Sequence, residues 1–272
     1  QSLRQNRRFA RFVNLPELLQ IFHSFADVKM ADSLNLPRPA LKDGKASIIA
    51  TPMSEYQQRI QKDLVERYER VRCGRIDPKV DNALKITTDG RKLALDARLV
   101  LPHLPEEAGK IDAVAENVYS IWERTKDSRA TQMVFCDLGV SNADGQFSVY
   151  DAIVRKLVAQ GIPAQEIACM GDYDTDLKKA RLFTRVRNGD VRVLLGSTQK
   201  MGTGTNVQER LVALHHVDAP WKPAEVEQRE GRILRQGNRN KEVEIYRYVT
   251  EGSFDAYMWQ TLQTKAEFIS QI

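Results

Sequence analysis

The sequence has few cysteines and no long apolar run. Cys73, Cys136 and Cys169 form no C-x-x-C pair, which excludes a disulfide framework and a cysteine zinc site. No segment approaches the roughly 18 consecutive apolar residues of a membrane span, so no membrane partner is expected. The first dozen residues also lack the apolar core of a secretory signal. We therefore expect a cytoplasmic protein and, because the chain begins with Gln1, a fragment of a longer one.

Several catalytic and metal-binding patterns are also missing. Both candidates for a Walker A loop, Gly44-Lys45-Ala46 and Gly109-Lys110-Ile111, lack the hydroxyl residue, and no D-E-x-x box follows a predicted strand. The chain therefore lacks the parts that hold Mg²⁺ and position the attacking water in nucleotide hydrolysis. The acidic residues of 172–176 lack the glycine and glutamate of a calcium loop, so a helix cap is expected there. His215 and His216 lie on opposite faces of a predicted strand, which favours a core or surface role. No metal site is predicted.

The remaining composition is that of an ordinary globular chain, whose pattern changes near residue 108. The net charge of +5 and the 42% hydrophobic content suit a chain that buries its own core. Residues 1–107 are expected to form a mainly helical linking segment. It has helices over 16–30 and 54–72, a strand over 48–50 and a linker over 74–108. Residues 108–272 alternate helices with apolar strands, which predicts an α/β fold: a RecA-like lobe with a mostly parallel sheet flanked by helices. The predicted strands are 133–136, 167–170, 191–195, 211–217 and 243–249.

A segment rich in glycine and threonine, residues 196–206, follows one of these strands. It therefore lies at the carboxyl end of a parallel sheet, where open α/β folds bind ligands. Glycine lets the backbone approach a ligand closely, and Ser, Thr and Asn side chains offer neutral hydrogen bonds to phosphate or ribose. The alternative is a plain glycine-rich turn.

A second candidate site lies on the predicted helix 223–236. At about 100° per residue, Gln228, Arg232 and Arg235 fall within roughly 60° of one another. Two arginines beside a glutamine suit a phosphate group. Gly231 costs a helix interior about 1 kcal/mol, so the close approach of another backbone or a ligand is expected there. The alternative is an exposed helix whose charges pair locally.

Both segments resemble motifs of Snf-type superfamily two helicases. The first is similar through Ser197-Thr198-x-x-x-Gly202-x-Gly204-x-Asn206. The second is similar through Asp218-x-x-Trp221-x-Pro223 followed by Gln228, Arg232, Arg235 and Gly237. The resemblance covers about 108–272. The preceding segment is similar to the region that joins the two lobes in very large phage and mobile-element helicases associated with DNA methyltransferases. Gln199 and Lys200 replace the family's arginine, which moves the expected DNA contact by one residue.

The resemblance implies the second motor lobe of an ATP-dependent DNA helicase or translocase, inactive without the first lobe. ATP and Mg²⁺ would be held mainly by that missing N-terminal lobe, and the partners would be the first lobe and the backbone of duplex DNA. Arg235 would be the arginine finger, and Arg232 would assist it on the γ-phosphate. The nucleotide would lie near Gln228, Gly202, Gly204 and Asn206, and DNA near Ser197, Thr198, Lys200 and Trp221.

Two other functions remain open. A non-enzymatic nucleic-acid-binding or scaffold module could keep this fold without motor chemistry. An RNA helicase is the third candidate, and the segment containing Trp221 disfavours it.

Overall fold

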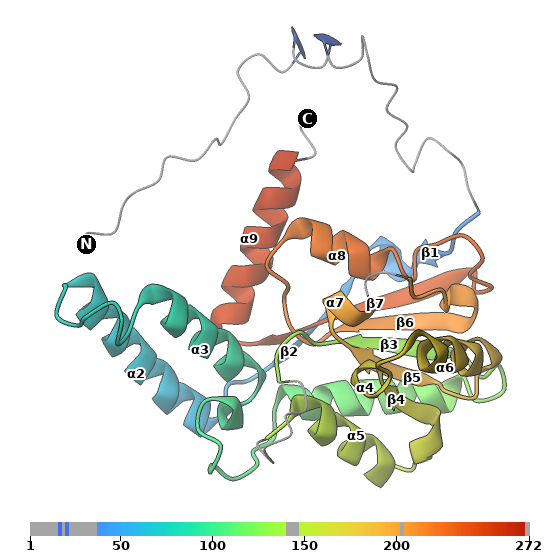
Figure 1. Ribbon diagram of the computed structural model, residues 1–272, viewed down its shortest axis with the longest axis horizontal. Helices are drawn as coiled ribbons and strands as arrows, with labels where there is room; N and C mark the ends of the chain where they lie inside the picture. Colours follow the sequence, from blue (N-terminus) through green and yellow to red (C-terminus); the bar gives the residue numbers. More distant parts are fainter. Residues whose placement is uncertain (1–15, 18–19, 22–36, 140–146, 202–203, 270–272) are drawn as a thin grey trace.

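The protein is built on one parallel sheet of seven strands (Figure 1). The computed structural model describes residues 16–17, 20–21, 37–139, 147–201 and 204–269. The strand order is β1-β7-β6-β3-β5-β4, with β2 also paired to β7. Every pair is parallel, which confirms the predicted RecA-like α/β fold. The strands are β1 (Ala40–Leu41), β2 (Ser47–Thr51), β3 (Thr131–Phe135), β4 (Ile167–Cys169), β5 (Val193–Gly196), β6 (Leu211–His216) and β7 (Glu242–Thr250).

Helices cover both faces of the sheet. The side chains of Val134 and Cys136 pack in one core with α4 (Lys110–Arg124) and α5 (Val149–Ala159). Met133 and Phe135 pack in the other core with α6 (Asp176–Asn188) and α7 (Thr198–Met201). Because both faces are buried, the strands are almost continuously apolar. Cys136 is a core residue, as expected, and burial raises the pKa of its thiol.

The edge of the sheet beyond β7 is formed by residues far away in the sequence. Ala40 of β1 pairs with Glu242, and β2 pairs with the second half of β7, from Ser47 opposite Tyr246 to Thr51 opposite Thr250. The sheet therefore takes two strands from the part of the chain expected to precede the lobe. The division at residue 107 stays a prediction.

Along the chain, two helices separate these edge strands from β3, and Figure 1 shows them to one side of the sheet. Helix α2 (Glu55–Arg72) begins at Ser54, whose side chain forms a capping box with Gln57. Helix α3 (Ala83–Leu95) begins at Asn82, whose side chain accepts a hydrogen bond from the amide of Lys85. The prediction of a linker over 74–108 is therefore wrong.

Helix α3 was not predicted from the sequence because a glycine, Gly90, interrupts its helical pattern. A Cβ at Gly90 would lie 3.7 Å from the Cβ of Phe254, the first residue of α9 (Phe254–Ile269). The glycine thus allows α3 and α9 to approach, and this packing offsets its low helix propensity. Most of the predicted helix over 16–30 lies outside the described residues.

No helix in the described parts of the chain is both long and apolar enough to cross a membrane.

His215 and His216 on β6 are core residues, in agreement with one of the two expected roles. Both are 0% exposed. The ring of His215 lies between the Tyr248 hydroxyl, 2.8 Å from Nδ1, and Gln132 Oε1, 3.0 Å from Nε2. Burial lowers the pKa of His215 to about 3 and that of His216 to about 4. Both rings are therefore neutral in the folded protein at pH 7.

The protein should lose stability between pH 6.5 and about pH 4. In this window the unfolded chain protonates both histidines and the folded chain does not, so the free energy of unfolding falls as pH falls. The loss should approach ~1 kcal/mol per pH unit for each histidine. Urea unfolding at pH 7 and pH 5 measures it. His215→Gln should reduce the slope, whereas a change of the exposed His103 to Gln should not. A free energy that stays constant between pH 7 and pH 5 would contradict this assignment.

Candidate functional site at the carboxyl ends of the strands

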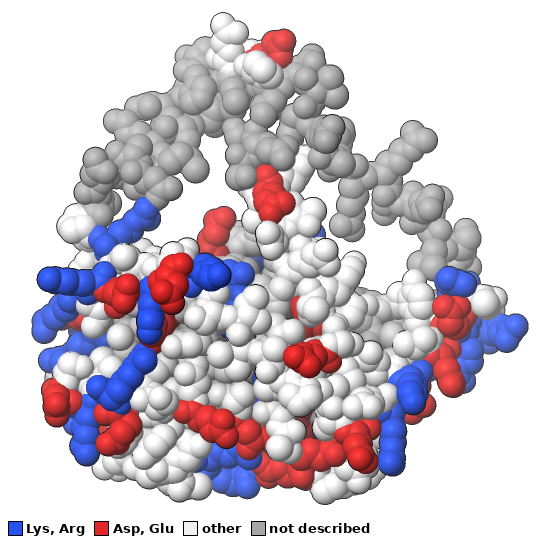
Figure 2. All heavy atoms as spheres, turned by 180° about the vertical axis from the view of Figure 1, so that it is seen from behind, with Lys and Arg blue, Asp and Glu red and all other residues white. Residues whose placement is uncertain are grey.

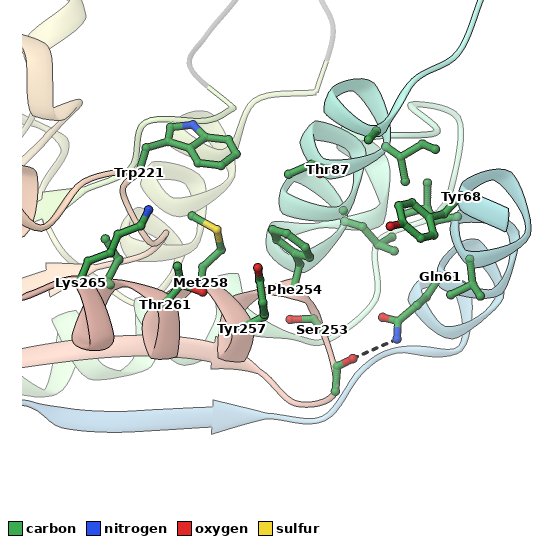
Figure 3. A pocket seen from close by; sticks show the side chains of 18 residues that line it. Gln61, Tyr68, Thr87, Trp221, Ser253, Phe254, Tyr257, Met258, Thr261 and Lys265 are labelled. Carbon is green, nitrogen blue, oxygen red and sulfur yellow. Dashed lines mark hydrogen bonds between the residues drawn. The ribbon is translucent and has the colours of Figure 1, made fainter. Parts of the chain in front are cut away.

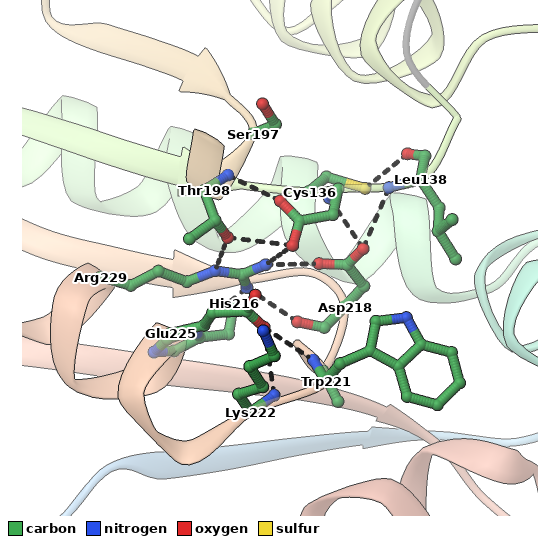
Figure 4. Close-up of polar contacts among 12 residues, drawn as sticks. Cys136, Leu138, Ser197, Thr198, His216, Asp218, Trp221, Lys222, Glu225 and Arg229 are labelled. Carbon is green, nitrogen blue, oxygen red and sulfur yellow. Dashed lines mark hydrogen bonds and ion pairs between the residues drawn. The ribbon is translucent and has the colours of Figure 1, made fainter. Parts of the chain in front are cut away.

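The carboxyl ends of three neighbouring strands meet at one edge of the sheet, where buried polar groups join them (Figure 4). Asp137 follows β3, Thr198 follows β5 and Asp218 follows β6. Asp218 Oδ2 accepts hydrogen bonds from the amides of Asp137 and Leu138, at 2.8 and 3.1 Å. The carboxylate of Asp137 in turn accepts from the Thr198 amide at 2.6 Å and from its hydroxyl at 2.9 Å. These bonds fix the three strand ends relative to one another.

Arg229 of helix α8 (Pro223–Glu230) lies at the centre of these groups and is 0% exposed. Its Nε donates to the Thr198 hydroxyl at 2.7 Å, and its Nη2 donates to Asp137 Oδ2 at 2.8 Å and Asp218 Oδ1 at 3.1 Å. Its Nη1 donates to the Asp218 carbonyl at 2.9 Å and lies 3.3 Å from His216 Nδ1. We call these five residues the Arg229 network.

One positive charge serves two carboxylates in this network, that of the buried Asp218 and that of the half-buried Asp137. Burial raises the pKa of Asp218, although the guanidinium of Arg229 opposes the shift. Burial also acts to raise the pKa of Asp137, but Arg229 and the hydrogen bonds from Thr198 lower it overall. The folded edge of the sheet therefore depends on this guanidinium for charge balance.

Arg229 was not among the predicted site residues, although the sequence contains a signal for its burial. Val226, Arg229 and Ile233 have the i, i+3, i+7 spacing of a core-facing helical stripe. An arginine in such a stripe requires a buried acid. The buried Asp218, already singled out as part of a motif, supplies it.

A hollow of about 500 Å³ opens beside the network, and we call it the Arg232–Arg235 hollow. Its lining is polar and comes from two segments, the loop after β5 and the end of α8. It brings together five residues predicted to bind a nucleotide or act on it. The lining residues are Gly204, Asn206, Glu227, Gln228, Gly231, Arg232 and Arg235.

The two arginines reach this hollow by a different geometry from the one expected. Helix α8 ends at Glu230, so the prediction of a helix to residue 236 is wrong. A Cβ at Gly231 would lie 2.9 Å from the Glu227 carbonyl oxygen. The glycine is therefore explained by contact with the helix's own last turn. Arg232 and Arg235 lie beyond the helix end and still converge with Gln228 on one hollow.

Arg232 and Arg235 place two positive charges close together. Arg232 is partly buried, and its Nη1 donates to the Thr205 carbonyl at 3.3 Å. Burial, and then the charge of Arg235, lower the pKa of Arg232. Arg235 itself is exposed. An anion in the hollow would relieve this repulsion, because its charge would lie close to both guanidinium groups.

The residues predicted to contact DNA lie at the same edge of the sheet, in different environments. Ser197 is half-buried and Lys200 is exposed, whereas Thr198 is only 6% exposed and its hydroxyl belongs to the Arg229 network. The DNA roles of these residues stay predictions. Gly202 lies outside the described residues.

Trp221 lies between the network and a groove. Its indole ring is 42% exposed, and the Arg91 guanidinium of α3 lies 4.3 Å from the ring centre. Arg91 also donates to the Ala219 carbonyl at 2.9 Å. The ring lines a groove of about 840 Å³ between α2, α3 and α9, together with Tyr68 and Tyr257 (Figure 3). Helix α3 therefore holds the loop that carries Trp221.

Charge on the rear face of the molecule is mixed. Figure 2 shows lysine and arginine interspersed with aspartate and glutamate there, without one continuous basic surface. Among the residues that the structure describes, no group of three or more His, Cys, Asp and Glu side chains could hold a metal ion.

The parallel sheet covered by helices on both faces defines a RecA-like α/β lobe. Residues 150–237 match the family described as the helicase conserved C-terminal domain. The match agrees with the resemblance to helicases found in the sequence.

A known protein matches a longer stretch of the chain than the family model does. The protein "Defense against restriction protein B" of Escherichia phage P1 is 39% identical over 136 residues, and a phage relative agrees with the similarity to phage helicases. The match covers 50% of this chain but 5% of that protein.

Among solved structures, the C-terminal part of the Fun30 ATPase domain matches with a TM-score of 0.61 at 15% identity. The match covers 84% of this chain and 90% of that one, and it shows a shared fold. The DUF1998 helicase MrfA bound to DNA matches with a TM-score of 0.41 at 16% identity, over 57% of this chain and 20% of that one.

Proposed function

We propose that this chain is the second motor lobe of an ATP-dependent DNA helicase or translocase. The observation that carries the proposal is the convergence of Gln228, Arg232 and Arg235 on one hollow at the carboxyl edge of the sheet. The substrate would be ATP presented by an N-terminal lobe, which would also hold most of the contacts to Mg²⁺. The lobe described here would complete the site from the opposite side.

Five residues of the hollow have proposed roles. Arg235, which is exposed, acts as the arginine finger and neutralises charge that develops on the transferred γ-phosphoryl group. Arg232, anchored on the Thr205 carbonyl, contacts the same phosphate. Gln228, Gly204 and Asn206 line the hollow where the rest of the nucleotide would lie, and the nucleotide contact predicted for Gly202 lies outside the described residues.

The isolated chain should show no appreciable DNA-stimulated ATP hydrolysis. It lacks a Walker A loop and an acidic box, so it cannot hold Mg²⁺ and position the attacking water. A two-lobe protein that carries this chain behind an N-terminal helicase lobe should hydrolyse ATP. Steady-state phosphate release, measured with and without duplex DNA, compares the two. Robust turnover by the chain alone would overturn the proposal of a site shared between two lobes.

DNA would bind at the same edge of the sheet through Ser197, Thr198, Lys200 and Trp221. The accessible side chains of this set are those of Lys200 and Trp221, whereas Ser197 is half-buried. The side chain of Thr198 would contribute little to DNA binding, because its hydroxyl already donates to Asp137 and accepts from Arg229. We propose backbone contacts to duplex DNA, without base readout.

Lys200→Ala should weaken the binding of duplex DNA to the chain equally for all sequences. If Lys200 contacts one phosphate, the slope of log affinity against log salt concentration should become shallower by about one. Fluorescence anisotropy at several salt concentrations measures the slope. Lys178→Ala is the matched control, because Lys178 is exposed but pairs with Asp174 at 2.8 Å. An unchanged slope in Lys200→Ala would exclude this lysine from the DNA contacts.

A further inference from the structure

We propose that Arg229 is a positioning residue for the Arg232–Arg235 hollow: it holds the two walls of the hollow in the spacing that a phosphate group requires. The proposal rests on the phosphate-binding function proposed above. It assigns a role to a residue that does not line the hollow.

The hollow has two walls from separate segments of the chain. One wall is the loop after β5, which includes Gly204 and Asn206, and the other is the end of α8 with the turn that follows. Arg229 joins the walls at the start of the loop, because its side chain leaves α8 and donates to the Thr198 hydroxyl at 2.7 Å. Arg232 joins them again near the end of the loop, through the Thr205 carbonyl at 3.3 Å. Two arginines of one segment therefore fix the opposite wall at two points.

Arg229 is the stronger of these two anchors. Its guanidinium is 0% exposed, and its donors face the hydroxyl of Thr198, both carboxylates, a carbonyl and an imidazole nitrogen. Asp137 extends the anchor, since it also accepts from the amide of Thr198 at 2.6 Å. Gln228 precedes Arg229 in the chain, so movement of Arg229 would move a wall of the hollow.

The geometry requires a guanidinium and not merely a positive charge. Arginine presents five N–H donors in a fixed plane, whereas lysine presents three on one nitrogen. A lysine at position 229 would keep the charge near Asp137 and Asp218 but could not also reach Thr198 and the Asp218 carbonyl from one point. Arg229→Lys therefore separates positioning from charge balance.

Arg192 offers a matched control at the other end of the same sheet. It is 1% exposed, and it donates to the carbonyls of Ala130 and Trp122 and to the Thr125 hydroxyl. It immediately precedes β5, whereas the hollow lies beyond the carboxyl end of that strand. Arg192→Lys should therefore cost stability without moving the walls of the hollow.

The experiment compares wild-type chain, Arg229→Lys and Arg192→Lys by two measurements. Amide hydrogen exchange reports the order of residues 204–207 and 228–235, and calorimetry with tripolyphosphate reports anion affinity. In Arg229→Lys, exchange in both segments should become at least about tenfold faster, while the core of β3 stays protected. Tripolyphosphate should bind about tenfold more weakly. In Arg192→Lys both readouts should match wild type, even where its unfolding midpoint is lower.

The outcomes separate this proposal from the function on which it rests. Wild-type exchange and affinity in Arg229→Lys would overturn the positioning role, as would equal losses in Arg192→Lys. If the wild-type chain does not bind tripolyphosphate and Arg235→Ala changes nothing, the phosphate function itself fails, whatever the exchange pattern. Weaker tripolyphosphate binding with unchanged exchange in Arg229→Lys would also contradict the proposal, because the walls would not have moved.

Discussion

Replacing Arg235 with alanine in the two-lobe protein is expected to lower the rate of ATP hydrolysis by about 10³-fold or more. Arginine fingers contribute about 10³–10⁵ to the rate in related phosphoryl-transfer enzymes, because they neutralise charge that develops in the transition state. The loss should fall mainly on kcat, with a smaller change in KM. Steady-state hydrolysis in the presence of saturating duplex DNA measures both constants.

Arg239→Ala is the control for this change. Arg239 is exposed and lies four residues further along the chain, but it pairs with Glu209 at 2.7 Å and does not line the hollow. Its replacement should leave hydrolysis unchanged. Full activity in Arg235→Ala would show that Arg235 is not an arginine finger. It would favour a scaffold module with a helicase-like fold.

Replacing Arg229 with methionine should reduce the free energy of unfolding by about 3–5 kcal/mol at pH 7. Removing one partner of a buried ion pair leaves the other charge uncompensated, and losses of this size are typical. Here a single guanidinium serves both Asp137 and Asp218. Denaturant unfolding of the chain measures the loss.

The loss in Arg229→Met should depend on pH in a defined direction. Arg229 lowers the pKa of Asp137 and opposes the rise that burial causes in the pKa of Asp218, so its loss should raise the pKa of both carboxyl groups. Ionising them would then cost stability as pH rises. The difference between wild type and variant should therefore grow from about pH 4 upward and shrink in acid.

A second substitution tests the cause of this loss. Arg229→Met combined with Asp218→Asn should recover part of the stability, because one uncompensated carboxylate is gone. A loss that is equal at pH 4 and pH 7, or one that Asp218→Asn does not reduce, would show that packing and not charge accounts for it.

The strands of the lobe and most of its helices could be predicted because their signals are local. Apolar runs such as 133–136 and 211–217 became β3 and β6, and Ser54 and Thr175 cap the helices expected to follow them. Helix α3 was missed because Gly90 lowers helix propensity, and only its contact with Phe254 explains it. That contact joins residues more than 160 positions apart, which no local pattern reveals.

The candidate site could also be predicted only in part, because it depends on contacts between distant segments of the chain. The spacing of Gln228, Arg232 and Arg235 predicted that they would share a ligand, and the structure brings them to one hollow although the helix ends before two of them. The Arg229 network could not be assembled from the sequence, because its members lie at or just beyond the ends of three different strands or on α8. Their proximity depends on strand order, which the sequence did not specify.

The pairing of β1 and β2 with β7 determines how this protein can be divided. A chain that began at residue 108 would leave one whole side of the nine-residue strand β7 without partners. Unpaired strand edges recruit other chains and promote aggregation. A fragment of this lobe should therefore begin before Ala40, so that the two short strands continue to cover this side of β7.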